Sequence, residues 1–124
     1  MIVKDGLFYT KTHEWLKADG DVATIGITDF AQNQMSDIVY VDLPKVGALV
    51  KAGEVLGTVE SVKSAEDFYS PVSGRIIEVN KLLEKSPEEI NKNAYDAWIV
   101  KLKMTNPSEL NNLMKKEAYE KMIK

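Results

Sequence analysis

Short apolar runs separated by turn residues dominate the first half of the chain. Segments 7–11, 14–17 and 22–27 are β-type, and Ala18-Asp19-Gly20-Asp21 supplies a turn between the last two. These segments predict a meander of short strands. Residues 37–43 are rich in β-branched side chains and are followed by a proline and a glycine, which predicts a buried strand.

The pattern continues with further strands and brief helices. Thr28 is a residue type that caps helices and Asp29 suits a first turn, so a helix is predicted from Asp29 to about Met35. Further strands are expected at residues 49–50, 55–60, 73–79 and 98–104.

Two cap signals lie in the last third of the chain. Ser86-Pro87-Glu88-Glu89 matches a capping box and predicts a helical turn from Pro87 to Asn91. Asn106-Pro107-Ser108-Glu109 repeats this pattern, and the apolar residues after it recur near one face, so an amphipathic C-terminal helix is predicted at about 107–123. The whole pattern predicts a mainly β fold, a sandwich or flattened barrel with short peripheral helices, as one domain over residues 1–124.

Composition narrows the function classes. The chain has no cysteine, one histidine, a net charge of −3 and a pI near 5.2, which argue against a thiolate metal site, a multi-histidine site and nucleic-acid binding. No apolar stretch is long enough to span a membrane, and the N-terminus resembles no export signal, so no membrane partner and a cytoplasmic location are expected.

The residues give weak evidence for catalysis. His13 is expected to be structural, since no nucleophile motif accompanies it. Glu14, Glu60, Glu66 and Asp67 are candidates to ring a cleft, although surface carboxylates are usually only solvated. Most aromatic residues are expected in the core or at half-buried sheet positions: Phe8, Tyr9, Trp15, Tyr40, Tyr69, Tyr95 and Trp98.

Lys63 lies where the strand pattern predicts the tip of a hairpin. The apolar runs 55–59 and 72–79 flank a short polar segment, and the chain returns through Phe68 and Tyr69. A lysine exposed on such a turn is accessible to an enzyme that acylates its ε-amine, as a covalent carrier requires. By itself, however, one lysine between short motifs is a signal with a high false-positive rate.

Several sequence segments that follow one another in the same order as in one family make the interpretation of Lys63 more specific. E-S-V-K-S-A-E-D at 60–67 and Y-S-P-V-S-G at 69–74 resemble the lipoylation segment of the glycine cleavage system H proteins. Y-T-K-T-H-E-W at 9–15, V-A-T-I-G-I-T-D-F-A-Q at 22–32 and D-I-V-Y-V-D-L-P at 37–44 resemble other blocks of the same family, so the resemblance covers nearly the whole chain.

The resemblance implies a lipoyl-domain-like β-sandwich, or barrel-sandwich hybrid, that is a carrier and not an enzyme. Lipoic acid would be attached to Lys63 by a lipoyl-attaching enzyme, and the arm would carry the aminomethyl group of glycine from glycine decarboxylase to aminomethyltransferase. Dihydrolipoamide dehydrogenase would then reoxidise the arm. The resemblance also implies that Thr12, Glu14 and Asp67 form a cleft for the loaded arm. A monomer is expected, because each enzyme must reach the tip in turn.

The sequence departs from the family pattern in two places, and three alternative functions are considered. The stretch 93–98 is one residue shorter than is common in the family and lacks its glycine, and Glu66 is an additional acid. The chain could be a related lipoyl carrier for sulfur oxidation or lipoate relay, or a β-domain whose lysine is never modified. A biotin carrier is disfavoured because Val62 and Ser64, not methionines, flank Lys63.

Overall fold

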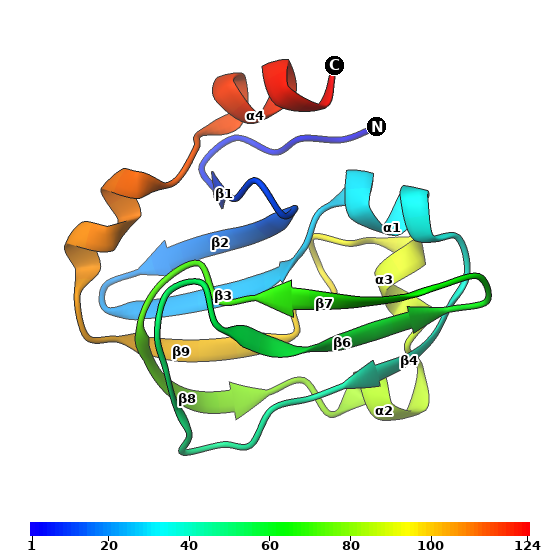
Figure 1. Cartoon of the computed structure of the whole chain (residues 1–124), viewed down its shortest axis with the longest axis horizontal. Coiled ribbons are helices and arrows are strands. Elements are labelled where there is room, and N and C mark those ends of the chain that lie inside the picture. Colours follow the sequence, from blue (N-terminus) through cyan, green and yellow to red (C-terminus); the bar gives the residue numbers. More distant parts are fainter.

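Two antiparallel sheets pack against each other around a shared hydrophobic core (Figure 1). The computed structural model describes residues 1–124, the whole chain. The 6-stranded sheet contains, in order, β1 (Phe8–Tyr9), β2 (Glu14–Asp19), β3 (Val22–Ile27), β9 (Val100–Met104), β8 (Gly74–Val79) and β5 (Leu49–Val50). The 3-stranded sheet contains β4 (Ile38–Asp42), β6 (Val55–Ser61) and β7 (Ala65–Tyr69). The predicted mainly β sandwich is confirmed.

Alternating side chains from both sheets fill the core. Leu16, Ile25 and Leu102 enter from the larger sheet, while Val59 and Phe68 enter from the smaller one, and all five belong to one buried cluster. The period of two along each strand sends the intervening polar residues outward. One continuous core therefore fixes how the smaller sheet, which carries the 55–69 hairpin, sits on the larger one.

Strand β4 corrects the prediction of a buried strand at 37–43. It forms one edge of the smaller sheet, and only Ile38 and Val41 are buried. Val39 is 54% exposed and Tyr40 50% exposed, so neither side chain belongs to the core. A run of β-branched residues predicts a strand but not the number of its faces that are covered.

Three short helices lie between strands. Helix α1 (Asp29–Met35) is confirmed, and Thr28 Oγ1 accepts its capping hydrogen bond from the Ala31 N–H at 3.2 Å. Helices α2 (Leu82–Lys85) and α3 (Glu89–Lys92) flank Ser86. The predicted capping box is wrong, since no side chain caps α3. The sequence pattern did not predict α2.

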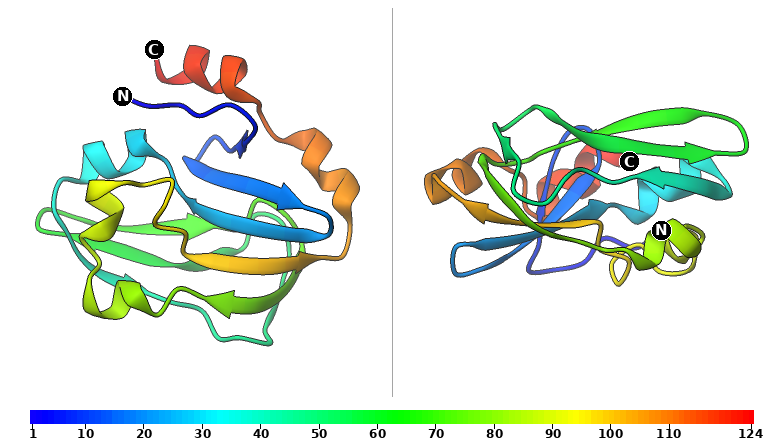
Figure 2. Two further views of the ribbon diagram at one scale, coloured as in Figure 1. Left: turned by 180° about the vertical axis from the view of Figure 1, so that it is seen from behind. Right: turned by 90° about the horizontal axis from the view of Figure 1, so that it is seen from below.

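The C-terminal segment is not the single helix predicted at 107–123. A 3₁₀ helix, η1 (Pro107–Asn112), comes first and α4 (Lys116–Ile123) second. Between them Met114 exchanges two main-chain hydrogen bonds with Tyr9, of 2.7 and 2.9 Å, and this extended pairing interrupts the helix. Glu109 does not cap a helix but accepts hydrogen bonds from the N–H and hydroxyl of Ser73. Figure 2 shows η1 and α4 as separate segments.

None of these helices combines the length and apolar character needed to cross a membrane.

Candidate functional site

Lys63 lies at the tip of the hairpin formed by β6 and β7. The main chain of Ser61 donates to Ser64 O at 2.7 Å, which leaves Val62 and Lys63 as the two turn residues. The Ser61 hydroxyl oxygen accepts from the N–H groups of Lys63 and Ser64, at 3.3 and 3.1 Å. Lys63 is exposed, as predicted, and the hairpin extends to the side of the molecule in Figure 1. The Val62 N–H also donates to Asp37 O, just before β4, at 3.0 Å. The turn is therefore held by local bonds and by this one contact with a neighbouring segment, and it leaves the lysine side chain accessible.

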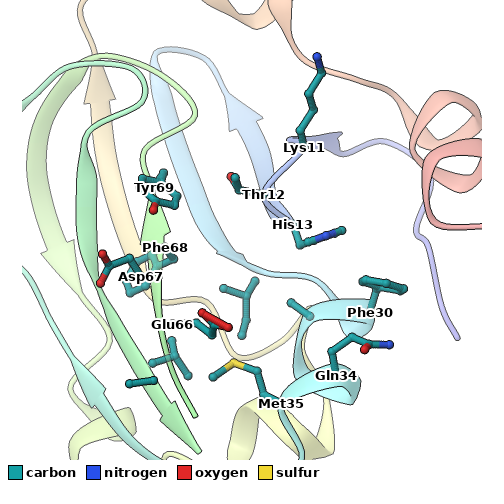
Figure 3. Close-up of a pocket in the computed structure, with 14 residues that line it drawn as sticks. Lys11, Thr12, His13, Phe30, Gln34, Met35, Glu66, Asp67, Phe68 and Tyr69 are labelled. Carbon is teal, nitrogen blue, oxygen red and sulfur yellow. The ribbon is translucent and has the colours of Figure 1, made fainter.

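A pocket of about 570 Å³ opens beside the same hairpin. Its walls come from β7, from the turn at Lys11–His13 and from α1, which contributes Phe30 and Met35 (Figure 3). Val59 and Phe68, which belong to the buried core, lie at its base. A polar rim above an apolar base is typical of pockets that take up a mostly apolar group with one polar end.

Glu14 lies behind the pocket wall and is not one of the lining residues. Its side chain is 1% exposed. Its carboxylate accepts hydrogen bonds from the hydroxyls of Thr10 and Thr12, the latter at 2.5 Å, and from the main-chain N–H of Tyr69 at 3.0 Å. Burial raises the pKa of Glu14, while these hydrogen bonds act in the opposite direction. Glu14 thus joins the wall formed by the Lys11–His13 turn to strand β7.

Thr12 and Asp67 both line the pocket, but they contribute differently. Because the Thr12 hydroxyl donates its hydrogen to Glu14, its oxygen keeps lone pairs that can accept a further hydrogen bond. The Asp67 carboxylate instead accepts from the Thr58 hydroxyl at 2.9 Å and points away from the pocket (Figure 3). The structure therefore brings the three predicted residues to one region but places only the Thr12 side chain on the pocket.

The carboxylate that does face the pocket belongs to Glu66. Glu66 is paired with Val59, whose side chain is buried, and residues opposite each other on an antiparallel pair share a face. Glu60, in contrast, is exposed and does not line the pocket. Of the four acids considered as a possible ring, only Glu66 directs its carboxylate into the pocket (Figure 3).

Tyr119 is a site residue that the sequence did not indicate. It is fully buried, and its hydroxyl lies 2.8 Å from His13 Nδ1 and 2.7 Å from Thr28 Oγ1. Its ring stacks on Tyr9, with centroids 4.6 Å apart. Helix α4 thereby holds two pocket walls, the Lys11–His13 turn and the start of α1. Burial raises the pKa of Tyr119 to about 12, so the hydroxyl stays protonated at neutral pH.

His13 forms part of the pocket wall. It has a φ of 71°, its ring packs on Phe30 with centroids 4.7 Å apart, and burial lowers its pKa. These contacts agree with the structural role expected of it. No three His, Asp or Glu side chains converge in a way that could hold a metal ion.

The chain is similar to known proteins over nearly its whole length. The family model described as glycine cleavage H-protein matches residues 7–124. A probable glycine cleavage system H protein of Thermoplasma volcanium is 59% identical over 121 residues, which are 98% of this chain and 97% of the relative. The glycine cleavage system H protein of Leptospira biflexa is 52% identical over 120 residues, 97% of this chain and 92% of the relative.

A solved structure supports the same relationship. The crystal structure of a glycine cleavage system H protein from Mycobacterium marinum superposes with a TM-score of 0.89, at 34% identity, and the match covers 98% of each chain. The chain therefore belongs to the glycine cleavage H-protein family.

Proposed function

We propose that the chain is the lipoylated carrier of a glycine cleavage system, with lipoic acid attached to the Nζ of Lys63. The observation that carries the proposal is the position of Lys63, exposed on a locally closed two-residue turn of the hairpin whose strand β7 borders the pocket. Family membership supports it. A lysine in this position can be approached by one enzyme after another, as a carrier requires, while the pocket offers a place for the end of its arm.

The attached group supplies chemistry that no side chain of this chain has. When bound, lipoic acid provides a disulfide that accepts electrons and a sulfur that carries the aminomethyl group of glycine from glycine decarboxylase to aminomethyltransferase, before dihydrolipoamide dehydrogenase reoxidises the dithiol. In this proposal the chain is a carrier and not an enzyme, and a lipoyl-attaching enzyme modifies Lys63.

The residues around the pocket position and shelter the end of the arm. Thr12 offers a hydroxyl oxygen as acceptor, and Glu14 fixes that hydroxyl while also binding the Tyr69 N–H. Asp67 forms part of the wall, and its carboxylate, bonded to Thr58, stabilises the hairpin from the outer side. The apolar base excludes water from a labile adduct. The monomeric state and the cytoplasmic location remain predictions.

The decisive experiment is the intact mass of the protein from its native host, followed by peptide mapping. The mass of the wild type should increase by one lipoyl group on Lys63, and removal of that amine's charge changes the net charge from −3 to −4. The Lys63→Arg variant should not be modified and should support no glycine-dependent turnover. Its free energy of unfolding should stay within about 0.5 kcal/mol of the wild-type value, because the side chain is exposed.

Lys45→Arg is the matched control, since Lys45 is also exposed but lies outside the hairpin. It should be modified and turned over like the wild type. Normal glycine turnover by Lys63→Arg would contradict the carrier function. A lipoylated wild type that supports no glycine decarboxylation would point instead to a related carrier, for sulfur oxidation or lipoate relay.

A further inference from the structure

We infer that residues 114–124, here called the C-terminal latch, open as one unit, and that their opening frees the Lys11–His13 wall of the pocket while the β6–β7 hairpin stays folded. The opening is a property of the folded chain itself. Its consequence for a loaded arm rests on the proposed carrier function, because a freed wall gives the end of the arm a way out of the pocket that leaves Lys63 in place.

The C-terminal segment is divided between two hydrophobic clusters. Leu110 and Leu113 pack against the main core, and Glu109 joins η1 to Ser73 by hydrogen bonds of 2.7 and 2.9 Å. The latch instead packs on a second, separate cluster. The buried residues of that cluster are Tyr9, Trp15 and Tyr119. Figure 1 shows α4 at one end of the molecule, beside the N-terminal segment and β1. Leu113 therefore marks the boundary between a part that the main core holds and a part that it does not.

The latch is attached by few contacts. Tyr119 is the only buried side chain of α4, and no side chain caps the start of this helix of 8 residues, a length that is marginal without tertiary packing. The ion pair of Lys116 with Asp5, at 3.9 Å, joins partly and largely exposed side chains and contributes little. Met114 adds its two main-chain hydrogen bonds with Tyr9. Such a segment should open with a free energy well below that of global unfolding.

Tyr119 connects the latch to the pocket wall. Its hydroxyl contacts His13 Nδ1 at 2.8 Å and Thr28 Oγ1 at 2.7 Å. The fully buried Thr28 hydroxyl in turn accepts from the Ala31 N–H at the start of α1. Opening of the latch removes the tyrosine from both partners. It leaves the bond from the Thr28 N–H to His13 O, of 3.0 Å, to hold the turn and α1 together.

The hairpin does not depend on the latch. Its turn is held within residues 61–64 and by the bond from the Val62 N–H to Asp37 O. Its strands contribute Val59 and Phe68 to the main core, and no hydrogen bond joins the hairpin to the latch. Opening of the latch should therefore change one wall of the pocket and leave the other as it is.

The test uses two proline variants of the same helix. Glu120→Pro places proline in the interior of α4, where it removes a main-chain donor and clashes with the preceding turn. Glu120 is exposed, so the substitution breaks the helix without removing a buried side chain. Lys116→Pro is the matched control, because Lys116 is the first residue of α4 and follows the extended Lys115, a position that proline tolerates.

The readout is amide hydrogen exchange of the full chain without a lipoyl group, followed by NMR. In Glu120→Pro the amides of Tyr9 and Met114, which pair the latch with β1, should exchange about tenfold faster than in the wild type or faster still. The amides of Thr28 and Ala31 on the wall should be accelerated as well, because Tyr119 no longer supports them.

The hairpin and the control variant give the reference values. The Ser61 amide, bonded to Ser64 O, should stay within about twofold of the wild type in Glu120→Pro, as should every one of these amides in Lys116→Pro. Unchanged exchange of Met114 in Glu120→Pro, or faster exchange of Met114 with Thr28 unchanged, would overturn the inference. Equal acceleration of Ser61 would overturn it too, since the whole chain would then open together.

The wild type provides a second measurement that does not depend on the folding of a variant. At urea concentrations below the unfolding transition, the amides of Met114 and Thr28 should share one free energy of opening, lower than that of the Ile99 amide in the core. Equal values at all three positions would overturn the inference. Neither measurement needs the lipoyl group, so a failure here is distinct from a failure of the carrier function, which the mass of the Lys63 peptide tests.

Discussion

The turn that presents Lys63 is closed mainly by atoms of its own residues Ser61–Ser64, with one further bond from the Val62 N–H to Asp37 O. The turn before Glu14 adds to its own local bonds two partners that lie 55 and 106 positions away in the sequence. The second arrangement, here called the Glu14–Tyr119 network, comprises Thr10, Thr12, His13, Glu14, Thr28, Tyr69 and Tyr119. The comparison separates two tasks. The shape of the Lys63 turn depends mostly on local bonds, while the pocket wall also depends on partners that only the assembled fold brings together.

This difference predicts that stability depends on the network and not on the groups that face outward. Substitutions within the network should lower the free energy of unfolding because they leave buried donors or acceptors unpaired. Substitutions of similar chemistry at exposed positions should have little effect. Two pairs of variants and one pH series examine this contrast in order of decreasing effect.

The largest effect is expected for Glu14→Ala. The variant removes the acceptor of the Tyr69 N–H and of two threonine hydroxyls. It should lower the free energy of unfolding by about 3 kcal/mol, measured by urea denaturation at neutral pH. Glu66→Ala, which removes the exposed carboxylate across the pocket, should change it by less than about 0.5 kcal/mol. Similar losses of stability in both variants would contradict the prediction that Glu14, and not Glu66, stabilises the fold.

An intermediate effect is expected for Tyr119→Phe. The phenylalanine ring can keep the stack on Tyr9, but the hydroxyl between His13 and Thr28 is lost. We expect a loss of about 1–2 kcal/mol in urea denaturation, because the buried Thr28 hydroxyl loses a partner. Tyr40→Phe removes a hydroxyl from a side chain that is 50% exposed and should be nearly neutral. An equally small change at Tyr119 would contradict its role in holding the pocket walls.

The smallest effect concerns pH. Burial lowers the pKa of His13 below its ordinary 6.5 in the folded protein. As the pH falls through that value, the unfolded chain takes up the proton first, so the free energy of unfolding decreases towards acid. Glu14, whose pKa burial raises, acts with the opposite sign in a range above its ordinary 4.5.

His13→Asn isolates the histidine contribution, since asparagine tolerates the φ of 71° found here. The free energy of unfolding, measured from about pH 8 to about pH 6, should fall less steeply in the variant than in the wild type. Identical slopes would mean that His13 takes up its proton equally readily in the folded and unfolded chain.

The parts of the fold that depend on the local residue pattern could be predicted from the sequence. The strands with alternating residues, the helix after Thr28 and the turn at Lys63 each follow from side chains close together in the chain. The structure of the 107–123 segment could not be predicted in this way. Its apolar spacing favours one helix, but the pairing of Met114 with Tyr9, on a distant strand, interrupts it.

The candidate site shows the same limit at the level of single residues. Lys63 could be placed from its flanking strands. Whether Glu66 or Asp67 faces the pocket depends on the register of β7, because a shift of one residue exchanges the two faces of a strand. Tyr119 carries no local signal at all, since its partners His13 and Thr28 lie 106 and 91 positions earlier. Only the folded chain shows that these residues meet.

The bonds within the Ser61–Ser64 turn also determine whether a substitution of Lys63 would destabilise the chain in a cell. Chaperones and proteases act on chains that spend time unfolded. A substitution of Lys63 leaves the bonds of the turn in place, because they come from main-chain atoms and from the Ser61 hydroxyl. Such a chain would fold, persist and escape protein quality control, so selection against it can act only through the missing activity.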